Sequence, residues 1–329
     1  MKAGKFSLEE LINRINSSDI LGLSKGITLI ESTLEKDRLM AEELLNKLLP
    51  KTGKSLRIGI TGVPGVGKST FIEAFGEYLI KEKNKKVAVL AIDPSSQQTK
   101  GSILGDKTRM EKLAANPNAF IRPSPSGKSL GGVANKTRET LLLCEAAGYD
   151  VTIIETVGVG QSETAVKSMT DFFLLLMLSG AGDELQGIKR GIMEMADLLA
   201  INKADGDNVK MANMAKAAYK NALHLLPPHE FNWTPTATTC SSLTGNGIDS
   251  IWNTIENYYQ QLEPNGSITA IRKKQQKEWL RETLQNRLME DFLEHPEAKK
   301  QMPELEKKVT NGKIIPSTAT RELIKLVLS

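Results

Sequence analysis

The sequence predicts an α/β protein built on a mostly parallel sheet with helices on both faces. Between residues 55 and 262, short runs rich in apolar and β-branched residues alternate with longer segments of helical periodicity, which is typical of parallel sheets. The runs are almost continuously apolar, as strands buried on both faces are, whereas half-exposed strands alternate. In chain order they are LRIGIT, KVAVLAID, AFIRP, DVTIIET, FFLLLML, DLLAINK and WTPTATT. Ligands of such sheets bind beyond the carboxyl ends of the strands, so we expect the functional residues directly after these runs.

The composition excludes several classes of protein. Of the 329 residues, 40% are hydrophobic and 25% charged, which is globular composition. The 43 Lys and Arg residues exceed the 39 Asp and Glu residues by too little to indicate a DNA-coating surface, and 5% aromatic residues argue against an RNA-stacking platform. Two cysteines and three histidines are too few for a disulfide scaffold or a histidine-based metal site. We therefore expect no nucleic-acid partner.

No segment of the sequence indicates export or membrane insertion. The longest apolar run covers only residues 172–178, whereas a bilayer span needs about 20 residues. The amino end carries acids in its first turns and lacks both an apolar secretory core and an Arg-rich transit pattern. We expect a cytoplasmic protein with no membrane partner.

Residues 1–54 are predicted to form a helical extension. Ser7 is a candidate N-cap with Glu10 three residues later, and apolar residues follow at helical spacing until Pro50 and Gly53 end the pattern. We interpret the extension as a cover for the following domain, with a partner-binding face as the alternative.

The strongest motif is a glycine-rich loop between the first predicted strand and the next helix. In such a loop several backbone N–H groups turn toward one anion, and the helix N-terminus adds positive potential. Lys68 would reach the β- and γ-phosphates of a nucleotide, and the Ser69 hydroxyl would bind Mg²⁺. The strand–loop–helix context favours this P-loop NTPase interpretation over a merely structural glycine turn. The predicted phosphate-binding residues are Gly62, Val63, Pro64, Gly65, Val66, Gly67, Lys68, Ser69 and Thr70.

Two acids at strand ends are candidates for the magnesium site. Asp93 ends the strand KVAVLAI and Glu155 ends the strand DVTII, so each could reach Mg²⁺ directly or through water. The alternative is that each is only a turn residue, but a neighbouring phosphate loop favours a metal ligand. The backbone N–H of Gly158, in the loop after Glu155, would face the γ-phosphate.

A second motif specifies the base. Asn202, Lys203 and Asp205 follow the strand DLLAI in the pattern NKxD. The Asp205 carboxylate can accept two hydrogen bonds from guanine, through N1–H and the exocyclic amine, whereas adenine offers no such donor pair. Lys203 would lie over the ring, and Asn202 would tie this loop to the phosphate loop. Ser241 and Ser242, after WTPTATT, are expected to present a backbone N–H to guanine O6.

Hydrolysis also needs an oriented water and charge neutralisation in the transition state. Gln161 could orient the water, although it could equally cap the next helix. No arginine finger is evident, and Arg109 and Lys189 are candidates that would move into place when a partner binds.

Residues 263–329 are predicted to be a helical arm, so that residues 55–262 form the nucleotide-binding domain. After the linker EPNGS, one helix carries Leu280, Leu284, Leu288 and Phe292 on a single narrow stripe among charged residues. Such a stripe is more typical of a dimer seam than of a membrane anchor, and packing on the chain's own core is the alternative.

Seven segments of the sequence resemble the methylmalonyl-CoA mutase-associated GTPases (MeaB-like), which belong to the SIMIBI class of P-loop GTPases. They lie within residues 58–205, and as a set they are specific, above all the fifth and sixth. The segments are GITGVPGVGKST, AIDPSS, GSILGDKTRM, SLGGVANKTRET, ETVGVGQSE, GAGDELQGIKRGIMEMADL and NKAD. The ends of the chain match that family in layout only.

The resemblance implies a homodimeric GTPase that chaperones an adenosylcobalamin-dependent acyl-CoA mutase. GTP binding and hydrolysis would gate cofactor loading and would protect or reactivate the mutase, with the adenosyltransferase that delivers cobalamin as a further partner. By the same resemblance Asp93, Asp106 and Glu155 are the magnesium-site acids, and residues 182–189 are a mobile third switch. The sequence departs from the family pattern at Ser179, Asn135 and Ser242.

Two other functions stay open at this point. A metal-insertion GTPase, also of the SIMIBI class, would need Cys or His ligands near the phosphate loop, and neither cysteine is placed for this. A transport-associated kinase or ATPase would need to tolerate adenine, which Asp205 opposes.

Overall fold

The computed structural model describes residues 6–92, 110–123, 130–156, 162–180, 190–227 and 231–328. Contacts divide the chain into two compact units, Met1–Gln275 and Gln276–Ser329. The division into three segments made from the sequence stays a prediction. Within the described residues, no helix is long and apolar enough to cross a membrane.

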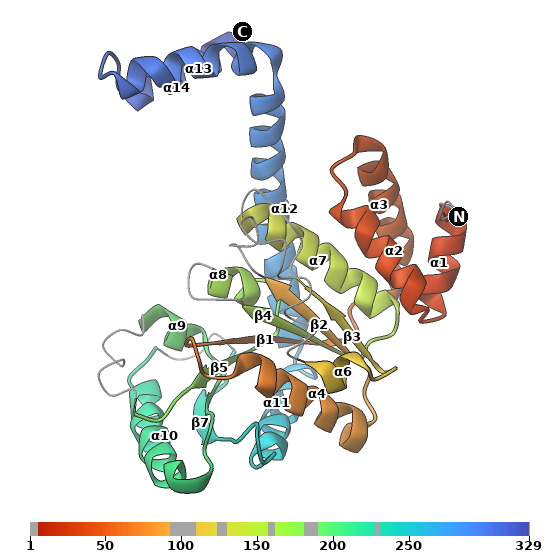
Figure 1. Cartoon of the computed structure of the whole chain (residues 1–329), viewed down its shortest axis with the longest axis vertical. Helices are drawn as coiled ribbons and strands as arrows, with labels where there is room; N and C mark the ends of the chain where they lie inside the picture. The colour runs from red at the N-terminus through yellow and green to blue at the C-terminus, as the bar shows by residue number, and fades with distance from the viewer. Residues whose placement is uncertain are drawn as a thin grey trace. The chain divides into compact units, whose positions relative to one another are not determined.

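The first unit is built on a parallel sheet in the order β3-β2-β4-β1-β5-β6-β7 (Figure 1). Every pairing between neighbouring strands in that order is parallel. Each of the apolar runs predicted from the sequence forms one strand, so the predicted α/β fold is confirmed. The strands are β1 (Leu56–Gly62), β2 (Val87–Ile92), β3 (Ala119–Arg122), β4 (Val151–Thr156), β5 (Phe172–Met177), β6 (Leu198–Ile201) and β7 (Thr236–Thr239).

Helices cover both faces of the sheet, as the two-sided burial of its strands requires. On one face, Phe71 of α4 and Trp252 of α11 pack against Ile58 and Ile60 of β1. On the other face, α7 and α8 pack against β2, β4 and β5, while α9 and α10 pack against β5, β6 and β7. The helices of this part are α4 (Lys68–Lys83), α6 (Glu111–Ala114), α7 (Leu130–Ala146), α8 (Ser162–Lys167), α9 (Arg190–Met195), α10 (Val209–His224) and α11 (Ile248–Leu262).

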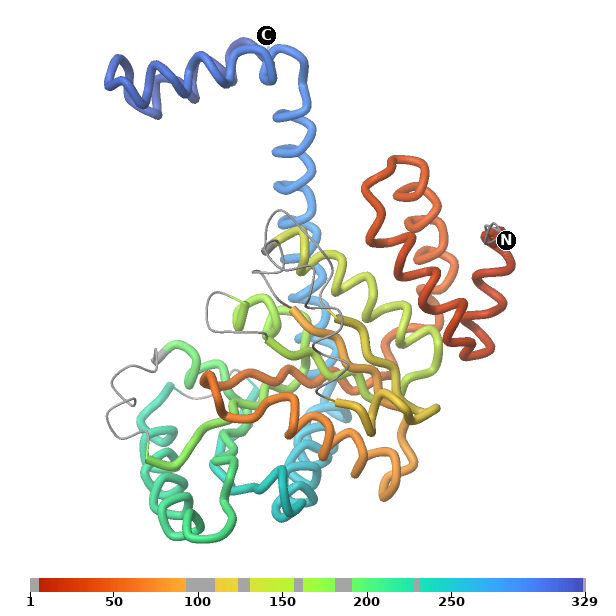
Figure 2. Tube along the Cα trace, viewed as in Figure 1, coloured from red at the N-terminus to blue at the C-terminus, as the bar shows by residue number. Residues whose placement is uncertain are grey.

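The amino-terminal helices pack on the outside of α7. They are α1 (Leu8–Asn16), α2 (Ile20–Glu31) and α3 (Glu35–Leu48), followed by the 3₁₀ turn η1 (Leu49–Lys51). Ser7 caps α1 in a capping box, with hydrogen bonds of 2.8 and 3.2 Å exchanged with Glu10. Ile15, Ile27 and Leu44 are fully buried in one cluster with α7. Figure 2 shows the three helices side by side at the red end of the trace, next to α7, as expected of a helical cover.

A titratable carboxyl lies where α3 meets α7. Burial raises the pKa of Glu139, on α7, from its ordinary 4.5 to about 7, while Lys136 and Arg38 lower it and Glu42 on α3 raises it further. A carboxyl group whose pKa is raised by folding stabilises the folded chain at pH values below its pKa in the unfolded chain. This contribution is lost as the pH rises through the pKa of the group in the folded chain.

We predict that Glu139→Gln makes the stability of the chain less dependent on pH. The contribution of Glu139 to the unfolding free energy should fall by roughly 2–3 kcal/mol between about pH 4.5 and pH 8, because ionised Glu139 is poorly solvated. Glutamine has the same shape and no charge, so the variant should be more stable at pH 8 and about equal at pH 4. Urea unfolding at both pH values measures this, with Glu43→Gln as an exposed control on α3. A difference in unfolding free energy between Glu139→Gln and the wild-type chain that is the same at both pH values would contradict the prediction.

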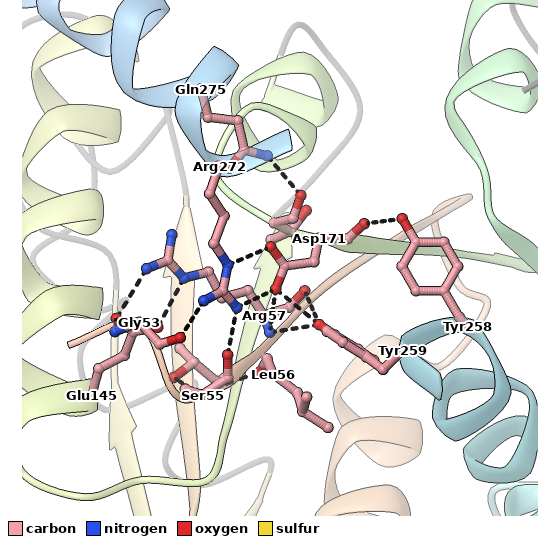
Figure 3. A network of polar contacts seen from close by, with 12 residues as sticks. Gly53, Ser55, Leu56, Arg57, Glu145, Asp171, Tyr258, Tyr259, Arg272 and Gln275 are labelled. Carbon is pink, nitrogen blue, oxygen red and sulfur yellow. Dashed lines mark hydrogen bonds and ion pairs between the residues drawn. The ribbon is translucent and has the colours of Figure 1, made fainter. Parts of the chain in front are cut away.

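A buried ionic network joins distant segments at the amino-terminal edge of the sheet (Figure 3). The Asp171 carboxylate, directly before β5, is fully buried. It accepts hydrogen bonds from Arg272 Nε at 2.9 Å and Nη2 at 2.6 Å, and from the Tyr259 hydroxyl at 2.9 Å. Arg272 also donates to the carbonyl oxygens of Gly53 and Ser55, at 2.5 and 2.7 Å. The network thereby fixes the start of α12 (Ser267–Glu294) to the beginning of β1 and β5.

The second unit contains the later part of α12 together with α13 (Pro296–Thr310) and α14 (Pro316–Leu328). Its small core is formed by Ala298, Leu305, Ala319 and Leu323. Beside this core lies an apolar cavity of about 880 Å³, lined by leucine, methionine and phenylalanine side chains of all three helices. On α12 the predicted stripe is solvent-exposed at Leu280, Leu284 and Leu288, with exposed fractions of 57–70%, whereas Phe292 packs against the core.

Candidate nucleotide-binding site

The glycine-rich loop connects β1 to α4 in the geometry of an anion site. Gly65 and Gly67 have φ of +75° and +87°, which L side chains rarely adopt. Gly62 is required for space, because a Cβ there would lie 2.5 Å from the Leu176 carbonyl oxygen on β5. Gly67 is the N-cap of α4 and provides no side-chain cap. Because glycine has no side chain, no N-cap side chain occupies the first N–H groups of α4, and they can bind an anion.

Lys68 lies between this loop and two buried acids. Its Nζ donates to the Gly62 carbonyl oxygen at 2.9 Å. Burial lowers the pKa of Lys68, while the negative charges of Glu155 and Glu163 act in the opposite direction. Both carboxylates are almost completely buried, with 2% and 3% of their surface exposed. The partly buried ammonium group thus lies next to the loop that would hold the phosphates, with two carboxylates near it.

Glu155 is placed by the sheet, and Glu163 by the helix that follows. Glu155 pairs with Ile60 of β1, so the end of β4 lies directly beside the phosphate loop. Glu163 is in the first turn of α8, which packs so closely on β1 that a Cβ on Gly59 would lie 2.7 Å from Val166. Sequence reasoning missed Glu163, although it lies within the segment ETVGVGQSE. An acid in the first turn of a helix is common on exposed helices as well, so its burial could not be predicted from the local pattern.

The described donors fit a magnesium ion in their chemistry. Ser69 and Glu155 offer a hydroxyl and a carboxylate oxygen, and hard oxygen ligands are those that Mg²⁺ prefers. In the described part of the chain, no three His, Cys, Asp or Glu residues cluster as a metal cage. Mg²⁺ usually takes one or two protein oxygens together with phosphate and water, so the hydroxyl and the carboxylate are in keeping with this ion.

The predicted base loop follows β6 and is bound to the phosphate loop through Asn202. This side chain is 1% exposed and donates from Nδ2 to the Val66 carbonyl oxygen at 2.9 Å. Its Oδ1 accepts hydrogen bonds from the Ser242 backbone N–H at 3.1 Å and from the Ser242 hydroxyl at 2.9 Å. Asn202 therefore holds three loops together, and the hydroxyl of Ser242 takes part in this contact.

Lys203 and Asp205 are oriented by further contacts. Lys203 Nζ donates to the Gly65 carbonyl oxygen at 2.9 Å, so its side chain extends back toward the phosphate loop. The Asp205 carboxylate accepts a hydrogen bond of 2.5 Å from the Ser241 hydroxyl, which in turn accepts from the Thr244 N–H at 3.1 Å. The structure thus brings the predicted phosphate-binding and base-binding residues to the same edge of the sheet.

Six predicted site residues lie outside the described part of the chain. They are Asp93, Asp106, Arg109, Gly158, Gln161 and Lys189, and the segment 182–189 lies outside it as well.

Comparison with known proteins decides the family. The family described as methylmalonyl Co-A mutase-associated GTPase MeaB matches residues 23–297. The chain belongs to this family. Among its relatives, the GTPase ArgK of Escherichia coli strain K12 is 45% identical over 321 residues, covering 98% of this chain and 97% of that protein. The mitochondrial methylmalonic aciduria type A homolog of Mus musculus is also 45% identical, covering 92% of this chain and 75% of its own length.

One solved structure agrees with this membership. The crystal structure of a protein titled LAO/AO transport system kinase has a TM-score of 0.76 and 38% identity, covering 99% of this chain and all of that one. Membership of the MeaB family confirms the resemblance seen in the sequence and makes the chain a GTP hydrolase that binds guanine nucleotides. The glycine-rich loop with Lys68 and Ser69 is the P-loop of this fold.

Proposed function

We propose that this MeaB-family GTPase chaperones an adenosylcobalamin-dependent acyl-CoA mutase, and that methylmalonyl-CoA mutase is the client. GTP binding and hydrolysis gate cofactor loading and protect or reactivate the mutase. The observation that carries this proposal is the family match over residues 23–297, because that family is described by its association with methylmalonyl-CoA mutase. The name of the mouse relative, which refers to methylmalonic aciduria, supports the same client. A cytoplasmic location and contact with the adenosyltransferase belong to the proposal.

The mechanism that we propose rests on positioning and charge neutralisation, which are what phosphoryl transfer to water requires. The loop amides and Lys68 neutralise the β- and γ-phosphates, while Asp205 and Lys203 hold the guanine at the other end of the site. Ser69, Asp93, Asp106 and Glu155 would hold Mg²⁺, which would supply further neutralisation of the phosphate charge. Gly158 contacts the γ-phosphate through its N–H.

The remaining catalytic groups are proposed to depend on the client. Gln161 orients the water, and Arg109 and Lys189 move toward the γ-phosphate when the mutase binds. The intrinsic rate of hydrolysis is then slow, and the client accelerates it by completing the site.

Homodimerisation is part of the proposal, and the second unit supports it. Three exposed leucines on α12 and an apolar cavity of about 880 Å³ are present in the same short helical unit. Exposed apolar side chains that gather on one surface are typical of protein–protein interfaces. We propose that a second copy of the chain covers it.

The two alternatives have less support. The thiols of Cys144 and Cys240 are buried and their pKa values are raised by burial, that of Cys240 to about 12, so neither is poised to bind a metal cargo as thiolate. One related structure is titled a transport system kinase. The Asp205 carboxylate, oriented by Ser241, favours a guanine nucleotide over ATP.

Calorimetric titration of candidate mutases with the chain in its GDP and GTP-analogue forms tests the proposal. We expect the methylmalonyl-CoA enzyme to bind with an affinity that differs by about tenfold or more between the two forms, and to accelerate GTP hydrolysis. Isobutyryl-CoA and ethylmalonyl-CoA mutases serve as competing clients. Sedimentation of the chain alone should give twice the mass of 36.1 kDa. Equal hydrolysis rates with and without each mutase, together with an affinity for each mutase that does not depend on the bound nucleotide, would contradict the chaperone role.

A further inference from the structure

The side chain of Asn208, at the start of α10, does not cap that helix. Asn208 occupies the N-cap of α10, and asparagine is among the best capping residues, yet its side chain makes no capping hydrogen bond. Its Nδ2 instead donates to the Lys203 carbonyl oxygen at 2.6 Å. Its Oδ1 accepts from the Ser179 hydroxyl at 2.5 Å. Both polar atoms of the amide are therefore directed away from the helix.

The two partners of Asn208 lie at the ends of neighbouring strands. Ser179 follows β5 and Lys203 follows β6, and these strands pair in parallel with Met177 opposite Ile201. The backbone of Asn208 also takes part, because its N–H donates to the Asp205 carbonyl oxygen at 3.0 Å. Asn208 thus closes the loop on itself, with one contact at Lys203 and another at Asp205, at the sheet edge where ligands of parallel sheets bind.

The contact at Lys203 restrains an unfavourable backbone conformation. Lys203 has φ of +59°, in the left-handed region that residues with a Cβ rarely adopt. Such a conformation persists only where the surrounding contacts impose it. The Lys203 carbonyl group, held by Asn208, and the Lys203 ammonium group, held by the Gly65 carbonyl oxygen, are two of those contacts.

We propose that Asn208, supported by Ser179, is a positioning residue for guanine recognition. By holding Lys203 in its left-handed conformation it directs the Lys203 side chain and the Asp205 carboxylate toward the same base. Asn208 touches neither base nor phosphate in this proposal and acts only through these two residues. The inference rests on the base-reading role assigned to Asp205 above.

The test compares the affinities of the chain for GDP and for inosine diphosphate. Inosine lacks the exocyclic amine of guanine, so the ratio of the two affinities reports the hydrogen bond between that amine and Asp205. A hydrogen bond to a charged group should make the wild-type chain prefer GDP by about tenfold or more. Asn208→Asp keeps the size and the capping ability of asparagine but loses the N–H donor. We expect this variant to reduce the preference for GDP at least about threefold.

Matched variants separate positioning from a general loss of structure. Asn213→Asp makes the same change on the same helix, where the side chain donates only to its own turn at Val209 and is exposed, and it should keep the wild-type preference. Ser179→Ala should reduce the preference in the same direction, and the double variant should be no worse than Asn208→Asp alone. An unchanged GDP preference in both Asn208→Asp and Ser179→Ala would overturn the proposal. If the wild-type chain does not prefer GDP to inosine diphosphate, or if Asp205→Asn leaves that preference unchanged, Asp205 does not recognise the base. That result would overturn the role of Asp205 and this proposal together.

Discussion

Replacing Arg272 with methionine should lower the unfolding free energy of the chain by about 3–5 kcal/mol. Arg272 donates two hydrogen bonds to the fully buried Asp171 carboxylate and two more to main-chain carbonyl groups before β1. Methionine fills a similar volume but offers no donor. The Asp171 charge would then stay buried with only the Tyr259 hydroxyl and the Arg57 N–H as partners, which is the costly way to break an ion pair. Urea unfolding followed by circular dichroism measures the loss.

A control on the same helix separates burial from loss of charge. Arg287 pairs with Asp291 on the exposed side of α12, so Arg287→Met removes the same charge there and should cost about 0.5 kcal/mol or less. Adding Asp171→Asn to Arg272→Met should recover part of the stability, because no uncompensated charge then stays buried. Similar losses for Arg272→Met and Arg287→Met would contradict the view that this network fixes the start of α12 to the sheet.

Much of the candidate nucleotide-binding edge of the sheet could be predicted from sequence, because its chemistry is local. The glycine loop and the NKxD motif each directly follow an apolar run, and parallel strands bring such strand ends to one edge. The contact between Asn202 and Val66 joins residues 136 positions apart, yet both belong to motifs that could be recognised.

Residues whose role depends on tertiary contacts could not be found in this way. Asp171 and Arg272 are 101 positions apart and belong to no motif, so the sequence around either residue does not indicate that they pair. Glu163 resembles an ordinary first-turn acid, and Asn208 resembles an ordinary cap. Acids in the first turn and asparagine at the N-cap are equally common where a helix begins at the surface. The tertiary structure alone distinguishes these two residues, through the close packing of α8 for Glu163 and the left-handed conformation of Lys203 for Asn208.

Replacing Lys68 with alanine should reduce the rate of GTP hydrolysis by at least about 10²–10³-fold, in keeping with the loss of one preorganised group that stabilises transition-state charge. Lys68 and Lys203 are positive side chains held beside the phosphate loop, and Glu155 and Glu163 lie near Lys68. In the structure its Nζ donates to the Gly62 carbonyl oxygen at 2.9 Å, at the start of the loop that would hold the phosphates. Single-turnover hydrolysis with saturating protein measures the chemical step apart from binding.

The matched control for this variant is Lys81→Ala, which removes the same charge from the exposed end of α4, where Lys81 pairs with Glu77. It should hydrolyse GTP at about the wild-type rate. Removing Lys68 also deprives two buried carboxylates of a neighbouring cation, so part of any lost activity could reflect unfolding. The melting temperature of each variant, with and without GDP, separates the two effects, because nucleotide that binds the folded chain raises that temperature. A folded Lys68→Ala protein that hydrolyses GTP within about tenfold of the wild-type rate would remove Lys68 from the catalytic machinery and leave the neutralisation of the phosphates to the loop amides and the proposed Mg²⁺.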